Sequence, residues 1–168
     1  LIQGCKTTVI PESVTKIGNW AFSRCTSLES ITIPDSVTEI GDDAFRGCTA
    51  LESIVVAEGN PVYDSREGCN AIIETKTNTL CYGCKSTNIP QSVTKIGRHA
   101  FAGCASLESV TIPEAVTEIE DYAFCDCRLL ESITIPKSVT RIGISAFKGC
   151  KSLKSITIPE SVTEIETL

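Results

Sequence analysis

Apolar and polar positions alternate in short stretches along the chain, and each stretch ends at a proline. Leu28–Pro34 reads Leu-Glu-Ser-Ile-Thr-Ile-Pro. A period of two predicts a strand with one buried face, and proline ends the strand because it cannot donate to a ladder. A second short strand is predicted at Val37–Ile40, with Gly41 at the next corner. We expect residues 42–48 to form one helical or 3₁₀ turn that carries Phe45 inward.

This unit recurs along the whole chain, so the chain is a tandem array. Its turns begin at equivalent strand positions: Cys5, Leu28, Leu51, Cys84, Leu107, Leu130 and Leu153. These positions are evenly spaced except for the longer step from Leu51 to Cys84. A fixed period of about 23 residues is typical of a solenoid, whose turns bury their apolar sides by stacking ~4.8 Å apart. The pattern predicts a β-rich solenoid with short helical or 3₁₀ corners and one β-hairpin insert, forming a single domain over residues 1–168.

Stacking in this register places equivalent residues in columns. The predicted core column residues of one turn are Ile31, Ile33, Val37, Ile40, Ala44 and Phe45. Two outward columns of the first strand are mostly hydroxylic: Thr7, Ser30, Ser53, Ser86, Ser109, Ser132 and Ser155, and beside them Val9, Thr32, Val55, Asn88, Thr111, Thr134 and Thr157. One interpretation is a flat docking face, with Thr32, Thr111, Thr134 and Thr157 as candidate contact residues. The alternative is a set of cross-strand Ser and Thr pairs that only solvates the sheet.

A charged column is predicted on the second strand. Lys16 faces Glu39, and the later members alternate in sign: Lys95, Glu118, Arg141 and Glu164. Opposite charges on adjacent strands are favourable and like charges are not, so we interpret this column as a device that controls register and not as a binding site.

Composition excludes several classes of function. A net charge of −6 and a pI near 4.9 argue against a nucleic-acid partner, because little here would neutralise phosphates. No apolar run approaches the ~18 residues that span a bilayer, so membrane insertion is not expected. The chain begins at Leu1 without a signal peptide, and neither end carries a polar capping repeat. We therefore expect a fragment of a longer array, either monomeric or weakly associated end to end.

Cysteines recur at one position of the repeat: Cys25, Cys48, Cys104, Cys127 and Cys150. Side chains stacked one turn apart point the same way, which disfavours disulfides, so we expect buried thiols that satisfy corner amides. Cys81-Tyr-Gly-Cys84 has the spacing of a redox or zinc motif. No second ligand pair accompanies it, since Cys69 and His99 are the only candidates, and no metal or cofactor is predicted.

The regular pattern is interrupted at residues 57–83. Residues 57–68 are rich in turn formers, and residues 70–75 and 79–82 flank a short loop, which predicts a hairpin that projects from the solenoid or widens one turn. Tyr63, Arg66 and Tyr82 lie in this insert and are candidate partner-binding residues, because Tyr and Arg are enriched at contact hot spots. The alternative is that the two tyrosines pack the hairpin onto the solenoid.

Aromatic residues also occupy a variable slot in the corners. Trp20 and Tyr122 stand where other turns have Asp43, His99 and Ser145. We expect this slot to be exposed, so Trp20 and Tyr122 are further candidate contact residues.

The repeated phrase resembles the BspA-like leucine-rich repeat family. It is clearest at residues 92–113 and 138–159, as Ser-Val-Thr-x-Ile-Gly-x-x-Ala-Phe-x-Gly-Cys-x-Ser-Leu-x-Ser-Ile-x-Ile-Pro. The insert is similar to the long units of that family in gut and oral anaerobic bacteria. The resemblance covers essentially the whole chain and implies a secreted or surface-exposed protein, with adhesion to host proteins or other cells in some members. It carries no catalytic motif.

The sequence is consistent with two functions. The first is a non-enzymatic extracellular adhesion module that binds a protein or glycan through a solenoid face or the hairpin. The second is a passive spacer within a larger surface protein. An enzyme is not expected, because one histidine and no nucleophile elbow leave no catalytic constellation. An ice-binding surface is disfavoured, since Val9, Val55 and Asn88 interrupt the threonine column.

Overall fold

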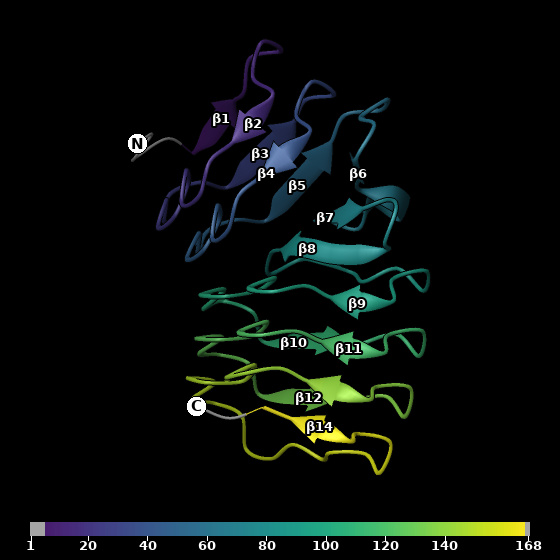
Figure 1. Ribbon diagram of the computed structural model, residues 1–168. Helices are drawn as coiled ribbons and strands as arrows, with labels where there is room; N and C mark the ends of the chain where they lie inside the picture. The colour runs from purple at the N-terminus through teal and green to yellow at the C-terminus, as the bar shows by residue number, and fades with distance from the viewer. Residues whose placement is uncertain (1–5, 167–168) are drawn as a thin grey trace.

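The computed structural model describes residues 6–166 as a stack of short parallel turns (Figure 1). Strand partners are separated by one sequence repeat, as in Thr7 with Ser30 and Ser30 with Ser53. The period read from the sequence is thus the pairing register of the solenoid. The turn start predicted at Cys5 lies outside the described residues.

The first strands of the turns form one side of the stack, here called the first face. Its strands are β1 (Thr7–Val9), β3 (Ser30–Ile33), β5 (Ser53–Val56), β10 (Ser109–Thr111) and β12 (Ser132–Thr134). They pair in the orders β1-β3-β5 and β10-β12, so the face divides between β5 and β10. Along β3 and β5 buried and outward residues alternate, as the period of two predicts.

The second strands form the other side. They are β2 (Lys16–Ile17), β4 (Glu39–Ile40), β9 (Lys95–Ile96), β11 (Glu118–Ile119), β13 (Arg141–Ile142) and β14 (Glu164–Ile165). The predicted charge column is in register: Lys16 Nζ lies 2.5 Å from Glu39 Oε1, and Lys95 Nζ lies 2.9 Å from Glu118 Oε1.

The corners are not helical, contrary to the expectation of a helical or 3₁₀ turn at residues 42–48. In the corner at residues 18–25 the amides of residues 21, 23 and 25 bond three residues back, while those of residues 20, 22 and 24 bond to the next turn. The alternation requires left-handed backbone at Trp20 and Arg24, both with φ of +60°. A helix would direct every amide along its own axis and leave the neighbouring corner without donors.

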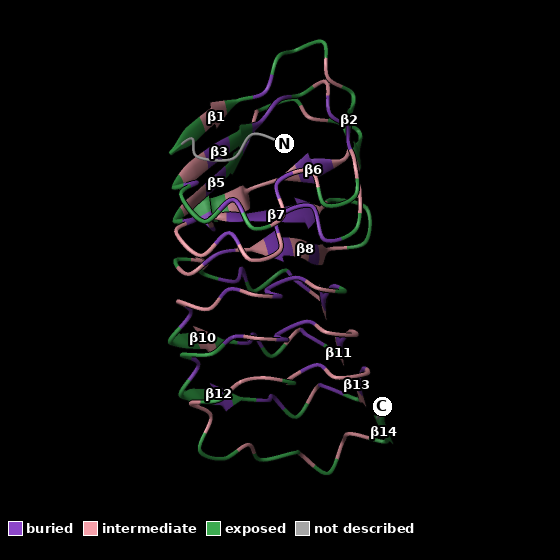
Figure 2. Cartoon of the chain, turned by 90° about the vertical axis from the view of Figure 1, so that its left-hand side faces the viewer, coloured by how far each residue is buried: buried purple, intermediate pink, exposed green. Residues whose placement is uncertain are grey.

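The core is a pair of contiguous apolar clusters, which Figure 2 shows as buried segments between the two sides. Phenylalanines stack along it: the ring centroids of Phe22 and Phe45 lie 5.3 Å apart, and those of Phe101 and Phe124 lie 5.1 Å apart. Phe45 is buried, as predicted.

The insert widens one turn instead of projecting from it. Its strands are β6 (Tyr63–Asp64), β7 (Ala71–Glu74) and β8 (Thr79–Gly83), with the 3₁₀ helix η1 (Arg66–Gly68) after β6. Within residues 6–166 they extend the second side into a seven-stranded sheet, ordered β14-β13-β11-β9-β8-β7-β6. The antiparallel β7–β8 pair is the predicted hairpin, and β8 pairs in parallel with β9.

The widened turn is wedge-shaped. On the corner side it adds no layer, because Gly47 N donates directly to Ala102 O at 3.2 Å across the insert. On the strand side the insert adds β8, β7 and β6 to the sheet beyond β9, at roughly one strand spacing of 4.8 Å each. The N-terminal turns are therefore tilted against the C-terminal turns (Figure 1).

Candidate interaction surfaces

The first face presents its hydroxyls outward, as predicted. Thr32, Thr111, Thr134 and Thr157 are exposed, and none of their hydroxyls bonds another residue of the described range 6–166. The predicted alternative of cross-strand hydroxyl pairs is thus not formed by these four side chains. The hydroxyls are free to meet solvent or a partner.

The two parts of this face differ in chemistry. In the N-terminal part Thr32 lies between Val9, which is 88% exposed, and Val55, also exposed. The C-terminal part carries threonines alone in the same column. Between them Asn88 donates its backbone amide to Cys69 O of the insert, and no strand forms at residues 84–90. The face is therefore two patches, of which the N-terminal one is more apolar.

The two insert tyrosines are core residues, which corrects their prediction as partner-binding residues. Tyr63 is 9% exposed and Tyr82 is 8% exposed. Tyr63 Oη accepts a bond from Ile40 N at 3.3 Å, and Tyr82 Oη donates to Gly41 O at 2.6 Å. Burial raises the pKa of the Tyr82 phenol. Both hydroxyls are used to attach the insert to the turn before it.

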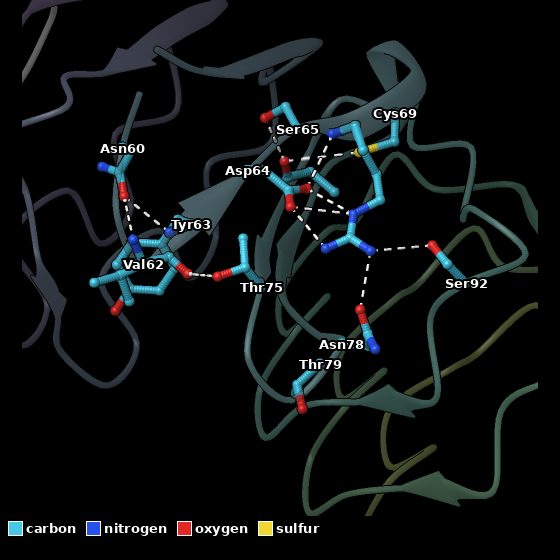
Figure 3. A network of polar contacts seen from close by, with 12 residues as sticks. Asn60, Val62, Tyr63, Asp64, Ser65, Cys69, Thr75, Asn78, Thr79 and Ser92 are labelled. Atoms are coloured by element: carbon cyan, nitrogen blue, oxygen red, sulfur yellow. Dashed lines mark hydrogen bonds and ion pairs between the residues drawn. The ribbon is translucent and has the colours of Figure 1, made fainter. Parts of the chain in front are cut away.

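Arg66 is also engaged inside the insert, where it bonds Asp64, Asn78 and Ser92, which Figure 3 labels. Its Nε and Nη2 bond the Asp64 carboxylate at 2.9 and 2.6 Å, and its Nη1 donates to Asn78 Oδ1 at 2.9 Å and Ser92 Oγ at 3.2 Å. The hydrogen bonds to Asp64 raise the pKa of Arg66. The guanidinium joins the insert to the following turn, so little of its bonding capacity remains for a partner.

The variable slot in the corners is exposed only in part. Trp20 is 57% exposed, as expected, and Tyr122 is half-buried. Asp43 is buried, however, and its Oδ1 lies 3.0 Å from His99 Nδ1, across the insert. The His99 ring packs edge-on against Tyr122 at 5.1 Å. Desolvation lowers the pKa of His99, with Asp43 opposing the shift.

Eight cysteines in residues 6–166 are free thiols: Cys48, Cys69, Cys81, Cys84, Cys104, Cys125, Cys127 and Cys150. Cys48 Sγ donates to Phe22 O at 3.0 Å, Cys127 Sγ to Phe101 O at 3.2 Å, and Cys150 Sγ to Phe124 O at 3.1 Å. The thiols thus bond carbonyl oxygens of the preceding turn, not corner amides as predicted. Burial raises the pKa of Cys48 to about 12.

The Cys81-x-x-Cys84 pair serves local contacts: Cys81 Sγ donates to Thr79 O and Cys84 Sγ to Asn70 O. Residues 6–166 contain no group of three or more His, Cys, Asp or Glu side chains arranged to hold a metal ion.

One charged site was missed from the sequence. A groove of about 230 Å³ on the corner side is lined by Arg24, Arg46, Gly47, Thr49, Gly103, Ala105, Asp126 and Arg128, and is here called the arginine groove. Arg46 Nη2 lies 3.8 Å from Asp126 Oδ2 although a whole corner separates them. The sequence does contain a signal for this site, because the long turn lacks the Ala-Phe corner. Without that corner, the corners on either side of the long turn come into contact.

Comparison with known proteins identifies the repeat. The family described as BspA type leucine rich repeat region matches residues 3–66 and 71–168 in six copies. No curated protein matches the chain.

Three solved structures share the architecture. A leucine-rich cell surface protein from Faecalibacterium prausnitzii A2-165 is 36% identical over 93% of this chain and 42% of its own, with a TM-score of 0.74. A leucine-rich repeat protein from Eubacterium ventriosum ATCC 27560 is 30% identical over 88% of this chain and 40% of its own, with a TM-score of 0.76. The pneumococcal vaccine antigen PcpA is 28% identical over 90% of this chain and 38% of its own, also with a TM-score of 0.76. The chain thus spans about two fifths of the length of these proteins.

Among the described residues no helix has the length and apolar character needed to cross a membrane.

Proposed function

Because the chain belongs to the BspA type leucine-rich repeat family, we propose that it is an extracellular, non-enzymatic adhesion module that binds a protein partner through the first face. Relatives of this family are non-catalytic repeat proteins, and one similar structure is a cell surface protein. Location at the cell surface is part of the proposal.

The observation that carries the proposal is the exposure of the N-terminal patch of the first face. Val9, Thr32 and Val55 form one exposed column on paired strands, and the fold leaves these side chains uncovered. Apolar and hydroxyl groups on a rigid sheet lose little conformational entropy when a partner covers them. The insert tyrosines, by contrast, are already buried, which favours the face over the hairpin as the contact surface.

The test is a binding screen of this chain against immobilised host matrix proteins. The double variant Thr32→Lys/Val55→Lys places two charges in the N-terminal patch, and Thr111→Lys/Thr134→Lys does the same in the C-terminal patch. Thr140→Lys/Thr163→Lys is the matched control, because both threonines are exposed beside strands of the second side. We expect the first double variant to abolish binding and the control to retain it.

Equal binding by all three variants would contradict the first face as the contact surface. Failure of the unaltered chain to bind any matrix protein would favour the alternative function, a passive spacer in a larger surface protein.

A further inference from the structure

The arginine groove owes its shape to the corner at residues 98–104. This corner presents Gly103, followed by Ala105, so it forms a floor of small residues between charged neighbours. Gly47 N bonds Ala102 O at 3.2 Å, which holds the preceding corner directly against it. Arg46 reaches across this floor to Asp126. The groove exists because the long turn contributes no corner of its own between them.

The charge of the groove opposes that of the chain. The whole protein carries a net charge of −6, yet three guanidinium groups and one carboxylate line this site. Asp126 pairs with Arg46, while Arg24 and Arg128 form no ion pair with any residue between 6 and 166. Positive charge in the groove is therefore left without an internal partner, which favours an anionic ligand.

The backbone supplies an independent observation. Arg24 and Asp126 have φ of +60° and +59° at a repeat position where Gly47, Gly103 and Gly149 have φ of +72° to +79°. A left-handed conformation is unfavourable for a residue with a side chain and much less so for glycine. At this repeat position two charged residues that line the groove therefore stand where other turns have glycine.

We propose that the arginine groove binds an acidic sugar residue, bearing a carboxylate or a sulfate, of an anionic glycan. Guanidinium forks match the paired oxygens of both groups. The groove is smaller than the roughly 300–1,000 Å³ of pockets for drug-sized ligands, so one acidic residue suits it. Its lining holds only small, hydroxyl and charged side chains, with no large apolar anchor of the kind that peptide partners require. The site is separate from the first face and goes beyond the proposed function.

The experiment measures binding of a heparin-derived sulfated tetrasaccharide, of sialyllactose, and of a glutamate hexapeptide by titration calorimetry. The test variant is Arg24→Ser/Arg128→Ser, which removes the two unpaired guanidiniums and keeps Arg46 in its ion pairs. The matched control Lys137→Ser/Lys154→Ser removes the same charge at exposed positions outside the groove. We expect at least one saccharide to bind, with affinity about tenfold or more weaker in the test variant and nearly unchanged in the control.

The two saccharides distinguish a sulfate from a carboxylate as the recognised group. A variant that fills the floor, Ala105→Glu, should also lose binding, and the thermal midpoint of each variant shows whether it is folded. Equal loss in the test variant and the control would overturn the proposal, because it would indicate general charge attraction. Tighter binding of the glutamate peptide than of either saccharide, or no saccharide binding at all, would also overturn it.

Discussion

The regular turns and the long turn use different groups to pack their cores and to satisfy their backbone hydrogen bonds. In a regular turn each backbone group and core side chain meets its own equivalent one repeat away, as in the stack of Phe22 on Phe45. In the long turn non-equivalent side chains take over: Tyr82 packs edge-on against Phe45 at 5.3 Å, and Ser65 Oγ accepts the Val56 amide at 2.9 Å. A solenoid therefore tolerates an irregular turn if side chains satisfy the groups that the ladder leaves open.

Asn60 shows how a single side chain takes over several of these hydrogen bonds (Figure 3). Its Nδ2 donates to Pro34 O and Val37 O, each at 2.8 Å, and its Oδ1 accepts the amides of Val62 and Tyr63. One amide side chain thus joins the insert to the loop of the preceding turn, where a regular turn uses a serine hydroxyl, as Ser36 Oγ does with Val14 O.

Loss of the Tyr82 side chain should have the largest effect on this junction. Tyr82→Ala removes a buried ring between the two halves, and we expect the free energy of unfolding to fall by about 3–5 kcal/mol. Tyr82→Phe, which removes only the bond to Gly41 O, should cost about 1 kcal/mol. Urea denaturation followed by circular dichroism measures both. A loss below ~1 kcal/mol for Tyr82→Ala would mean that the halves do not depend on the insert for their packing.

A methyl group at Gly83 should have the next largest effect. A Cβ there would lie 2.2 Å from Phe101 Cε1, so Gly83→Ala forces the buried ring to move and should cost about 1–3 kcal/mol. Gly18→Ala is the control in a regular turn, since a Cβ at Gly18 has no neighbour within 4 Å. Equal thermal midpoints for the two variants would contradict close packing of β8 against Phe101.

Ser65→Ala should have a smaller effect, about 1–2 kcal/mol, because it removes the acceptor of the Val56 amide and one donor to the Ala71 carbonyl. Ser138→Ala in a regular turn removes only a donor to Val116 O and should cost less. Hydrogen exchange at the Val56 amide should become faster in the first variant alone. Unchanged exchange would show that the Ser65 hydroxyl does not protect this edge of the sheet.

The smallest effect should be the pH dependence of stability that arises from the contact between Asp43 and His99. The pKa of His99 is lowered in the folded chain, so the unfolded chain binds more protons near its ordinary value of 6.5. Stability from this residue is therefore complete above that value and is lost as the pH falls. The surrounding charges are Asp42, Asp43, Arg46 and Arg98.

The check compares the denaturation midpoints at pH 7.5 and pH 5.5 in the unaltered chain and in His99→Gln. We expect the drop on acidification to be smaller in the variant. A larger drop in the variant would mean that His99 is protonated more readily in the folded state.

Much of the fold could be predicted from the sequence because its contacts are periodic. The constant repeat step predicts the partner of every regular strand, and alternation within Leu28–Pro34 predicts which residues face the core. The same step places Lys16 beside Glu39 and the threonines of the first face outward. In each case a local pattern is sufficient, since a residue meets its own equivalent in the next turn.

The tertiary structure decided what lies outside that period. The insert enters the sheet instead of projecting because its apolar strands bury Tyr63 and Tyr82 against the preceding turn. The arginine groove forms because an absent corner brings Arg46 within reach of Asp126. These contacts join residues that occupy different positions of the repeat, so no periodicity predicts them. They follow only from packing the irregular turn between its neighbours.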